Sequence, residues 1–322
     1  MFKRNLIFIF FGIILLGIGL VIGFFSQRLS PLKNNFNSAV SHEFINPIVN
    51  LNLDKHFIIN FQPLKEKFIA IQEKYPQKTY IYFNYLNNAS WIGLNEKDLF
   101  TAASTIKVPL AMALFKAIEE GKLKLTDEYS LEELDLNENF GELYKVGPEK
   151  QFTIEELMKI MLEQSDNTAM NAIDNIFKKI GIENPLNNVY EFMGWQESNN
   201  ELIPVMGKLP NYQDINLKTL SNMFLALYNA TYINTENSNK ILMYLINSPF
   251  NEKLVAGVPE DIPVAHKIGI AADKETFSDC GIIYAPNREY ILCVGSGGTD
   301  EKSANQFITE VSKATYQFVI NN

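Results

Sequence analysis

The pattern of apolar residues divides the chain into three parts. Residues 6–25 form an unbroken run of apolar and glycine residues, long enough as a helix to cross the roughly 30 Å core of a bilayer. Residues 27–58 are rich in Asn, Ser and Pro and keep no period, which is typical of a tether. Regular periods recur over residues 59–322, where we expect one globular domain.

A cleaved signal peptide is the competing interpretation of the first segment. Its apolar core would be shorter, and a cleavage site between small residues would follow it. The sequence Ser26-Gln27-Arg28 follows instead, so residues 1–26 are predicted to be an uncleaved membrane anchor. Lys3 and Arg4 precede the apolar run and would stay in the cytoplasm, which places the domain outside the cell membrane.

Within the domain, aromatic-rich or alternating segments predict strands, and a period near 3.6 predicts helices. Strands are expected at Lys78–Leu86, Ala89–Leu94, Val264–Ile270, Ser278–Tyr284 and Tyr290–Ser296. Helices are expected at Pro63–Lys74, from Ser104 to Gly121, and at Ile154–Glu163, Thr168–Lys179, Leu186–Met193, Leu217–Tyr228, Ser238–Asn247 and Ala304–Ile320, with an irregular segment at Gly194–Asn216. We therefore predict an α+β fold, in which an N-terminal hairpin and a C-terminal meander form one antiparallel sheet covered by helices, with an all-α subdomain at one side.

Composition narrows the chemistry. The net charge of −9 argues against a nucleic-acid partner, and the sequence has no Gly-rich phosphate loop. The three His and two Cys residues lack metal-ligand spacing, so neither a metal nor a cofactor is expected. Cys280 and Cys293 lie on the two arms of the last predicted hairpin; a disulfide in an exported domain and two buried thiols are both open.

The stretch around Ser104 carries the first candidate chemistry. Lys107 follows three positions later, so the hydroxyl and the amine can meet on one face of the predicted helix. A lysine whose pKa is lowered by burial or by a neighbouring cation can take the proton of a serine nucleophile. The plain structural alternative is that Ser104 caps the helix and Lys107 is solvated.

Two further motifs follow in the chain. Ser165-Asp166-Asn167 lies at a predicted helix junction, and His266-Lys267-Ile268-Gly269 lies on a predicted strand. The order and spacing of the three motifs resemble the penicillin-recognising serine hydrolases, which are the class A β-lactamases and the related DD-peptidases. The resemblance covers about residues 61–320 and implies the class A β-lactamase fold.

The resemblance assigns the catalytic roles. It implies that Ser104 attacks a carbonyl group and forms an acyl-enzyme, and that Lys107 accepts its proton or holds a proton network. Ser165 would pass a proton to the leaving nitrogen. In the class A enzymes a loop glutamate activates the deacylating water, and Glu201 lies at about the corresponding position.

The resemblance also assigns substrate-binding residues. Asn167 would hold the substrate amide, and Lys267 would face its carboxylate. The backbone N–H groups of Ser104 and Ile270 would form the oxyanion hole, and Gly269 belongs to the same strand segment. His266 is interpreted as a structural neighbour of Lys267 and not as a base.

Two departures from the family pattern affect these assignments. Ile268 stands where the family has Thr or Ser, so a hydroxyl that would bind the substrate carboxylate is missing. Glu201 is followed by Leu-Ile-Pro204, which departs from the family's Glu-x-x-Leu-Asn pattern. The alternative interpretation of Glu201 is a solvated loop acid without a catalytic role. Asp214 could hold the far end of this loop. The sequence therefore supports acylation better than turnover.

The expected function is a monomeric, membrane-anchored and extracytoplasmic serine hydrolase that hydrolyses a β-lactam amide. The first alternative is a penicillin-binding DD-peptidase that acts on D-Ala-D-Ala stems of peptidoglycan. An alternative of another class is a non-catalytic cell-wall binding or sensor module, which the departures favour and the complete set of site residues opposes.

Overall fold

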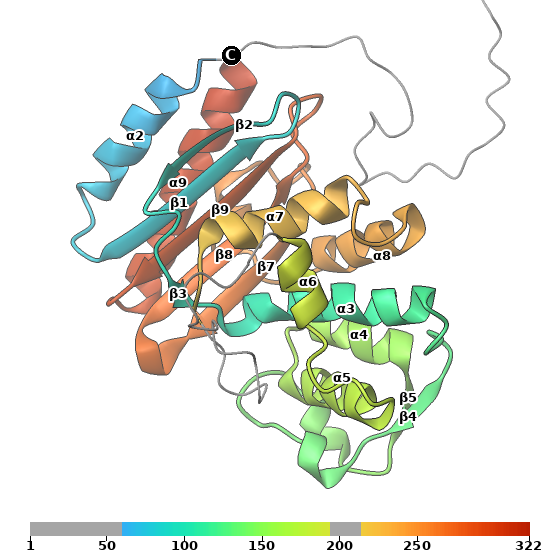
Figure 1. Ribbon diagram of the computed structural model, residues 1–322. Coiled ribbons are helices and arrows are strands. Elements are labelled where there is room, and N and C mark those ends of the chain that lie inside the picture. The colour runs from blue at the N-terminus through green and yellow to red at the C-terminus, as the bar shows by residue number, and fades with distance from the viewer. Residues whose placement is uncertain (1–59, 194–213) are drawn as a thin grey trace, which may run out of the picture. The chain divides into compact units, whose positions relative to one another are not determined.

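The computed structural model describes residues 60–193 and 214–322, which contain a five-stranded sheet with helices on both faces (Figure 1). The strands are β1 (Lys78–Tyr85), β2 (Ser90–Leu94), β7 (Val264–Ala271), β8 (Thr276–Ile283) and β9 (Tyr290–Gly297). Their order is β2-β1-β9-β8-β7, and every neighbouring pair is antiparallel. The N-terminal hairpin and the C-terminal meander thus join through β1 and β9, which confirms the predicted α+β fold.

The two faces of the sheet bury different cores. On β1, Ile81 and Phe83 pack with α2 (Gln62–Gln72) and α9 (Glu301–Asn321), whereas Tyr82 belongs to the core on the opposite face. That opposite face lies under two more helices (Figure 1). These are α7 (Leu217–Tyr228) and α8 (Thr235–Ile246). Successive strand residues point to opposite faces, and because both faces are covered, these strands are buried almost throughout.

A helical part lies beyond the β7 edge of the sheet (Figure 1). It contains α3 (Lys107–Glu119), α4 (Ile154–Glu163), α5 (Asn167–Lys179) and α6 (Asn187–Phe192). It is not all-α as predicted, because β4 (Glu128–Ser130) and β5 (Gln151–Thr153) pair as a short antiparallel ribbon. Segments of three residues are too short to show a period of two, so no sequence pattern predicts them.

Two helices begin earlier than their apolar periods indicate. Helix α8 starts at Thr235 because the Asn234 side chain accepts a hydrogen bond from the backbone of Asn237. Helix α9 starts at Glu301 because Asp300 accepts one from Ser303 in the same way. These first turns are polar, so their caps, and not their periodicity, mark where the helices begin.

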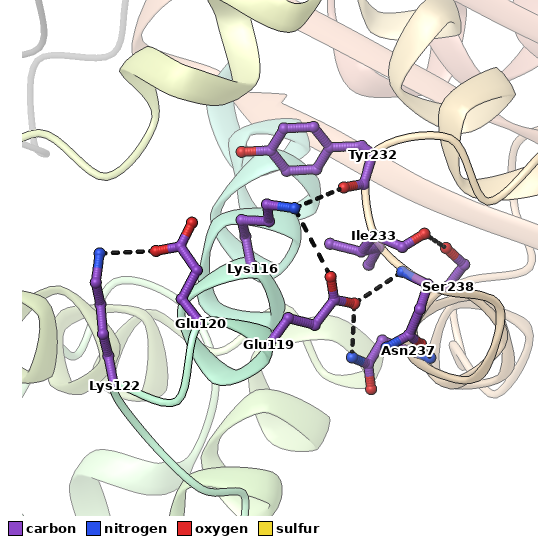
Figure 2. Close-up of polar contacts among 9 residues, drawn as sticks. Lys116, Glu119, Glu120, Lys122, Tyr232, Ile233, Asn237 and Ser238 are labelled. Atoms are coloured by element: carbon purple, nitrogen blue, oxygen red, sulfur yellow. Dashed lines mark hydrogen bonds and ion pairs between the residues drawn. The ribbon is translucent and has the colours of Figure 1, made fainter.

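The C-terminal end of α3 fixes the turn that precedes α8, as Figure 2 shows. The carboxylate of Glu119 accepts hydrogen bonds from the Asn234 backbone at 2.7 Å and from the Asn237 side chain at 2.9 Å. Lys116 lies over the ring of Tyr232 and 3.5 Å from its carbonyl oxygen. Because α8 packs on β7, these contacts tie the C-terminal end of α3 to the helix that covers this strand.

The two cysteines lie directly opposite each other on β8 and β9. Cys280 and Cys293 are paired in register, are fully buried, and are joined by a disulfide. Of the two states that the sequence left open, the structure has the disulfide. It ties together β8 and β9, the last two strands of the C-terminal meander, and β8 is the neighbour of β7.

The predicted anchor and tether lie outside the described residues. Among residues 60–193 and 214–322, no helix combines the length and the apolar character that a membrane span requires.

Candidate active site

Ser104 lies in a short 3₁₀ turn, η2 (Ala103–Ile106), that leads directly into α3. The backbone N–H and the hydroxyl of Thr105 both donate to the carbonyl oxygen of Ala102, at 3.1 and 2.6 Å. Ala103 has a left-handed backbone with φ of 46°, a conformation that concentrates at functional sites because it costs a non-glycine residue on the order of 1 kcal/mol or more. Ser104 does not cap α3, whose N-cap is Ile106.

A second contact that the sequence did not reveal anchors this turn. Just before it, β3 (Phe100–Thr101) pairs with β6 (Asp214–Ile215). The pairing places the backbone of Asp214 opposite Thr101. It therefore fixes the end of the predicted irregular segment beside the nucleophile turn.

Lys107 is completely buried and lies within hydrogen-bond distance of Ser104, Ser165 and Asn167. Its Nζ lies 2.6 Å from the carbonyl oxygen of Ser165, 2.8 Å from Oδ1 of Asn167 and 3.0 Å from Oγ of Ser104. A neutral amine has two N–H bonds and one lone pair. The two carbonyl-type oxygens can only accept, so they take both N–H bonds, and the lone pair is left for the Ser104 hydroxyl.

The surroundings favour the neutral amine. Burial lowers the pKa of Lys107 well below its ordinary value, and the nearby charge of Lys267 lowers it further. The carboxylate of Asp166 opposes this shift but is the smaller effect. Lys107 is therefore suited to act as a base at neutral pH.

Ser165 is fully buried and has a left-handed backbone with φ of 57°. This conformation lets its carbonyl oxygen and its hydroxyl both approach Lys107, at 2.6 and 3.3 Å. A non-glycine residue with positive φ is uncommon, because the conformation is strained. In Ser165 this conformation places both the carbonyl oxygen and the hydroxyl at the Lys107 amine.

Asp166, the middle residue of the second motif, has a structural task. One carboxylate oxygen caps α5 by accepting from the backbone of Ala169, and the other accepts from the backbone of Leu143. A side chain at Gly141 would collide with Asp166, and the φ of 93° at Gly141 also favours glycine. The backbone N–H of the next residue donates to the carbonyl oxygen of Phe140, so this loop is fastened to the motif twice.

Lys267 lies on β7 with only 1% of its surface exposed. Its Nζ has no hydrogen-bond partner within the part of the chain that the structure describes, and it lies 5.8 Å from the ring centre of Phe250. Burial lowers the pKa of Lys267 to about 7, although the charge of Asp279 acts in the opposite direction. An amine that lacks a hydrogen-bond partner and lies near enough to Lys107 to lower its pKa is suited, when charged, to an anionic group of a substrate.

The other residues of the third motif bring β7 against the nucleophile turn. A Cβ at Gly269 would lie 2.9 Å from the carbonyl oxygen of Ala102, so only glycine lets the strand come this close. Ile268 and Ile270 line the cavity in front of Ser104. Because β7 is an edge strand of this sheet, alternate backbone N–H groups point away from β8 towards the turn.

His266 is on the opposite face of β7 from Lys267. Its Nδ1 lies 2.9 Å from a carboxylate oxygen of Asp279, and both side chains are buried. Asp279 also accepts from the backbone of Leu254. This pair fixes the back of the strand and does not reach Ser104.

Two cavities with volumes of about 550 and 500 Å³ are both lined by Ser104. Together they form the substrate space. Further lining residues that the sequence did not single out are Asn137, Asn139, Phe140, Asn171, Asp273 and Lys274. They come from loops and from one helix with no shared spacing, so no motif could have identified them. Glu201 lies outside the described residues. Within residues 60–193 and 214–322, no group of three His, Cys, Asp or Glu side chains is placed to hold a metal ion.

Solved structures with the same fold include one of PBP-A, with a TM-score of 0.71 and 23% identity over 81% of this chain and 97% of that one. A beta-lactamase from Sphaerobacter thermophilus has a TM-score of 0.70 and 22% identity over 82% of this chain and 99% of that one. An acyl-enzyme complex of a PBP-A mutant with penicillin G also matches, with a TM-score of 0.71, 22% identity, and coverage of 81% of this chain and 97% of that one.

The search of curated proteins found no match. The model of the beta-lactamase enzyme family matches residues 63–319, which contain all three motifs and the whole sheet. The chain is therefore a serine hydrolase and belongs to the beta-lactamase enzyme family.

Proposed function

We propose that the chain hydrolyses β-lactam amides through an acyl-enzyme at Ser104. The observation that carries this proposal is the position of the Lys107 amine. It lies 3.0 Å from Oγ of Ser104, while two oxygens that can only accept occupy its N–H bonds. A positioned base of this kind contributes about 10²- to 10⁴-fold to a reaction rate.

Acylation begins with transfer of the Ser104 proton to the lone pair of Lys107. The Ser104 oxygen then bonds to the carbonyl carbon of the substrate, and the carbonyl oxygen becomes an oxyanion. The backbone N–H groups of Ser104 and Ile270 stabilise that oxyanion; such donors are worth about 10²- to 10³-fold each. Breakage of the C–N bond needs a proton on nitrogen, and Ser165, whose Oγ lies 3.3 Å from Lys107, relays it.

The substrate is held on both sides of its reacting carbonyl. Asn167 lines the cavity and offers its side-chain N–H₂ group to the acylamide of the substrate, because its Oδ1 is engaged by Lys107. Lys267 supplies positive charge for a carboxylate. Ile268 contributes only an apolar surface beside that charge, so the carboxylate loses one hydrogen-bond donor.

Deacylation requires a base that activates water, and we propose Glu201 for this role. If Glu201 does not act, the acyl-enzyme persists and the chain behaves as a penicillin-binding DD-peptidase. The missing Glu-x-x-Leu-Asn pattern at Glu201 supports this second candidate, because deacylation depends on that base. The fold likeness to PBP-A is compatible with it.

The same proposal places the enzyme at the outer face of the cell membrane, anchored by residues 6–25. The buried disulfide between Cys280 and Cys293 supports an exported domain, since such bonds persist in oxidising compartments.

The test measures turnover of a chromogenic cephalosporin by the detergent-solubilised full-length chain. We expect hydrolysis by the wild type, none by Ser104→Ala, and a burst without turnover by Glu201→Gln. A single burst by the wild type itself would favour the DD-peptidase, and release of D-alanine from a D-Ala-D-Ala peptide would then identify it. Full turnover by Ser104→Ala would contradict both functions.

A further inference from the structure

The surroundings of Lys267 carry an inference that rests on the proposed function. Ile268 and Ile270, its neighbours on β7, both line the cavities in front of Ser104, but Lys267 does not. Its side chain is 1% exposed, and its Nζ has no hydrogen-bond partner within residues 60–193 and 214–322. The cation that should receive the substrate anion is therefore closed off from the substrate space.

Two aromatic rings lie beside this buried amine. Phe250, in the loop between α8 and the turn at Val255–Gly257, has its ring centre 5.8 Å from Nζ of Lys267. The same ring lies 5.8 Å from the ring of Phe140. Phe140 comes from the helical part and lines the cavity, so the ring pair connects that part to the loop that carries Phe250 beside the lysine.

We propose that Phe250 and Phe140 form a gate over Lys267, and that an anionic substrate reaches this lysine only after Phe250 moves aside. Phe250 is then a specificity-determining residue. It admits substrates whose binding free energy exceeds the free-energy cost of separating the two rings. It also limits the rate at which anionic substrates bind.

The charges around Lys267 agree with a gate. Asp279 on β8 is the opposite charge that acts on it, while Lys107 on α3 is a like charge that it influences in turn. The carboxylate of Asp166 acts on the pKa of Lys107 and not on that of Lys267. With the rings closed, burial outweighs Asp279 and the pKa of Lys267 falls to about 7. Opening admits water or a carboxylate, either of which favours the charged amine.

Phe250 is the movable member of the pair. The backbone of Phe140 is held because its carbonyl oxygen accepts from the backbone of Asn167. Phe250 is half-buried and lies between the exposed residues Pro249 and Asn251. The proposed movement is therefore that of Phe250, whose ring lies beside Lys267.

The test is competitive acetylation of the full-length chain as a function of pH, with peptide mass spectrometry at each lysine. Neutral amines react, so each lysine gives a midpoint and a limiting rate at high pH. For wild-type Lys267 we expect a midpoint near 7 and a slow limiting rate. In Phe250→Ala the midpoint rises and the limiting rate increases about tenfold, because the amine becomes hydrated and accessible.

Two controls are matched to this design. Lys253 is buried to the same degree, at 2% exposure, and pairs with Glu301, so its acetylation must not change in Phe250→Ala. Phe192 forms a comparable ring pair with Tyr232, with ring centres 5.0 Å apart and away from the cavities, so Phe192→Ala must leave Lys267 unchanged. If Phe250→Ala does not fold, Phe250→Leu takes its place, with a smaller rise expected.

The gate is refuted if the limiting rate of Lys267 in the folded Phe250 variant stays within about twofold of wild type. It is also refuted if wild-type Lys267 already reacts as fast as the exposed lysines. This result does not depend on β-lactam chemistry, so it separates failure of the gate from failure of the proposed function. Where acylation occurs, Phe250→Ala should increase the second-order rate for an anionic penicillin and not for its neutral ester.

Discussion

The Lys107 amine and the Ser165 carbonyl oxygen lie 2.6 Å apart, although 58 positions separate the two residues. The contact exists because Ser165 adopts a left-handed backbone, which turns its carbonyl group towards the amine. It occupies one N–H bond of Lys107 and so directs the lone pair at Ser104. The proposed base thus depends on a backbone conformation as much as on a side chain.

The first prediction concerns that conformation. Ser165→Gly and Ser165→Ala both remove the relay hydroxyl, so both should slow acylation to a similar extent. They should differ in stability, because glycine adopts positive φ without strain while alanine does not. Ser165→Val should be destabilised further, by about 1–3 kcal/mol, since a β-branched residue is disfavoured there. Urea unfolding measures the relative stability of the three variants. Equal stability of the glycine and valine variants would contradict the proposed importance of the positive φ at Ser165.

The second prediction is a pH profile that depends on the charge of the substrate. Lys107 must be neutral to act as a base, so the acylation rate rises with pH through its lowered pKa. Lys267 must be charged to bind a carboxylate, so the rate for an anionic penicillin falls as pH increases through about 7. The neutral methyl ester of the same penicillin should lack the falling limb. Stopped-flow acylation measures both profiles, and identical profiles would count against Lys267 as the anion site.

A matching variant checks the coupling between the two lysines. Lys267→Gln removes the like charge that helps to lower the pKa of Lys107. Its rising limb should therefore move to higher pH, and its falling limb should disappear. A rising limb that stays in place would mean that burial alone sets the pKa of Lys107.

The third prediction restores the missing hydroxyl. Ile268→Thr places a donor beside the anion site, and a single hydrogen bond to a charged group is worth about 1.5–3 kcal/mol. The second-order acylation rate for anionic penicillins should rise about tenfold or more. Ile268→Val is the control, because it shortens the same buried side chain without adding a donor. An equal gain in the valine variant would attribute the effect to volume.

The fourth prediction separates structure from chemistry within the second motif. Asp166 caps α5 and holds the loop at Leu143, and it does not itself line either cavity. Asp166→Ala should destabilise the fold by about 2–3 kcal/mol, because it removes a helix cap and leaves a buried N–H without a partner. Thermal unfolding measures this. A variant of unchanged stability would show that other contacts hold the loop.

The elements with a clear period were predictable from the sequence. The strands from Lys78 and Val264 and the helix from Ile154 appear close to their predicted ends, because apolar spacing over many residues records burial directly. The order of the three motifs likewise identified Ser104, Lys107 and Lys267 as neighbours, which the structure brings to one side of the sheet. The anchor at residues 6–25 and Glu201 stay predictions.

Other features depend on contacts between residues far apart in the chain. The two-residue pairing of Phe100–Thr101 with Asp214–Ile215 is too short to leave a period. The positive φ of Ser165 and the ring pair of Phe140 and Phe250 arise only when separate loops meet. Sequence patterns reflect local geometry and burial. The features named above depend instead on how distant segments of the chain meet.

The most direct test of the central claim is intact-protein mass spectrometry of the full-length chain mixed with a penicillin, followed by peptide mapping. The account predicts an adduct of one penicillin mass on Ser104 within the first minutes, and none in Ser104→Ala. It further predicts that Lys107→Met, which keeps the buried chain but loses the base, slows the adduct by about 10²- to 10⁴-fold. A folded wild-type chain that acquires no adduct at saturating penicillin, or one acylated at another residue, would contradict it.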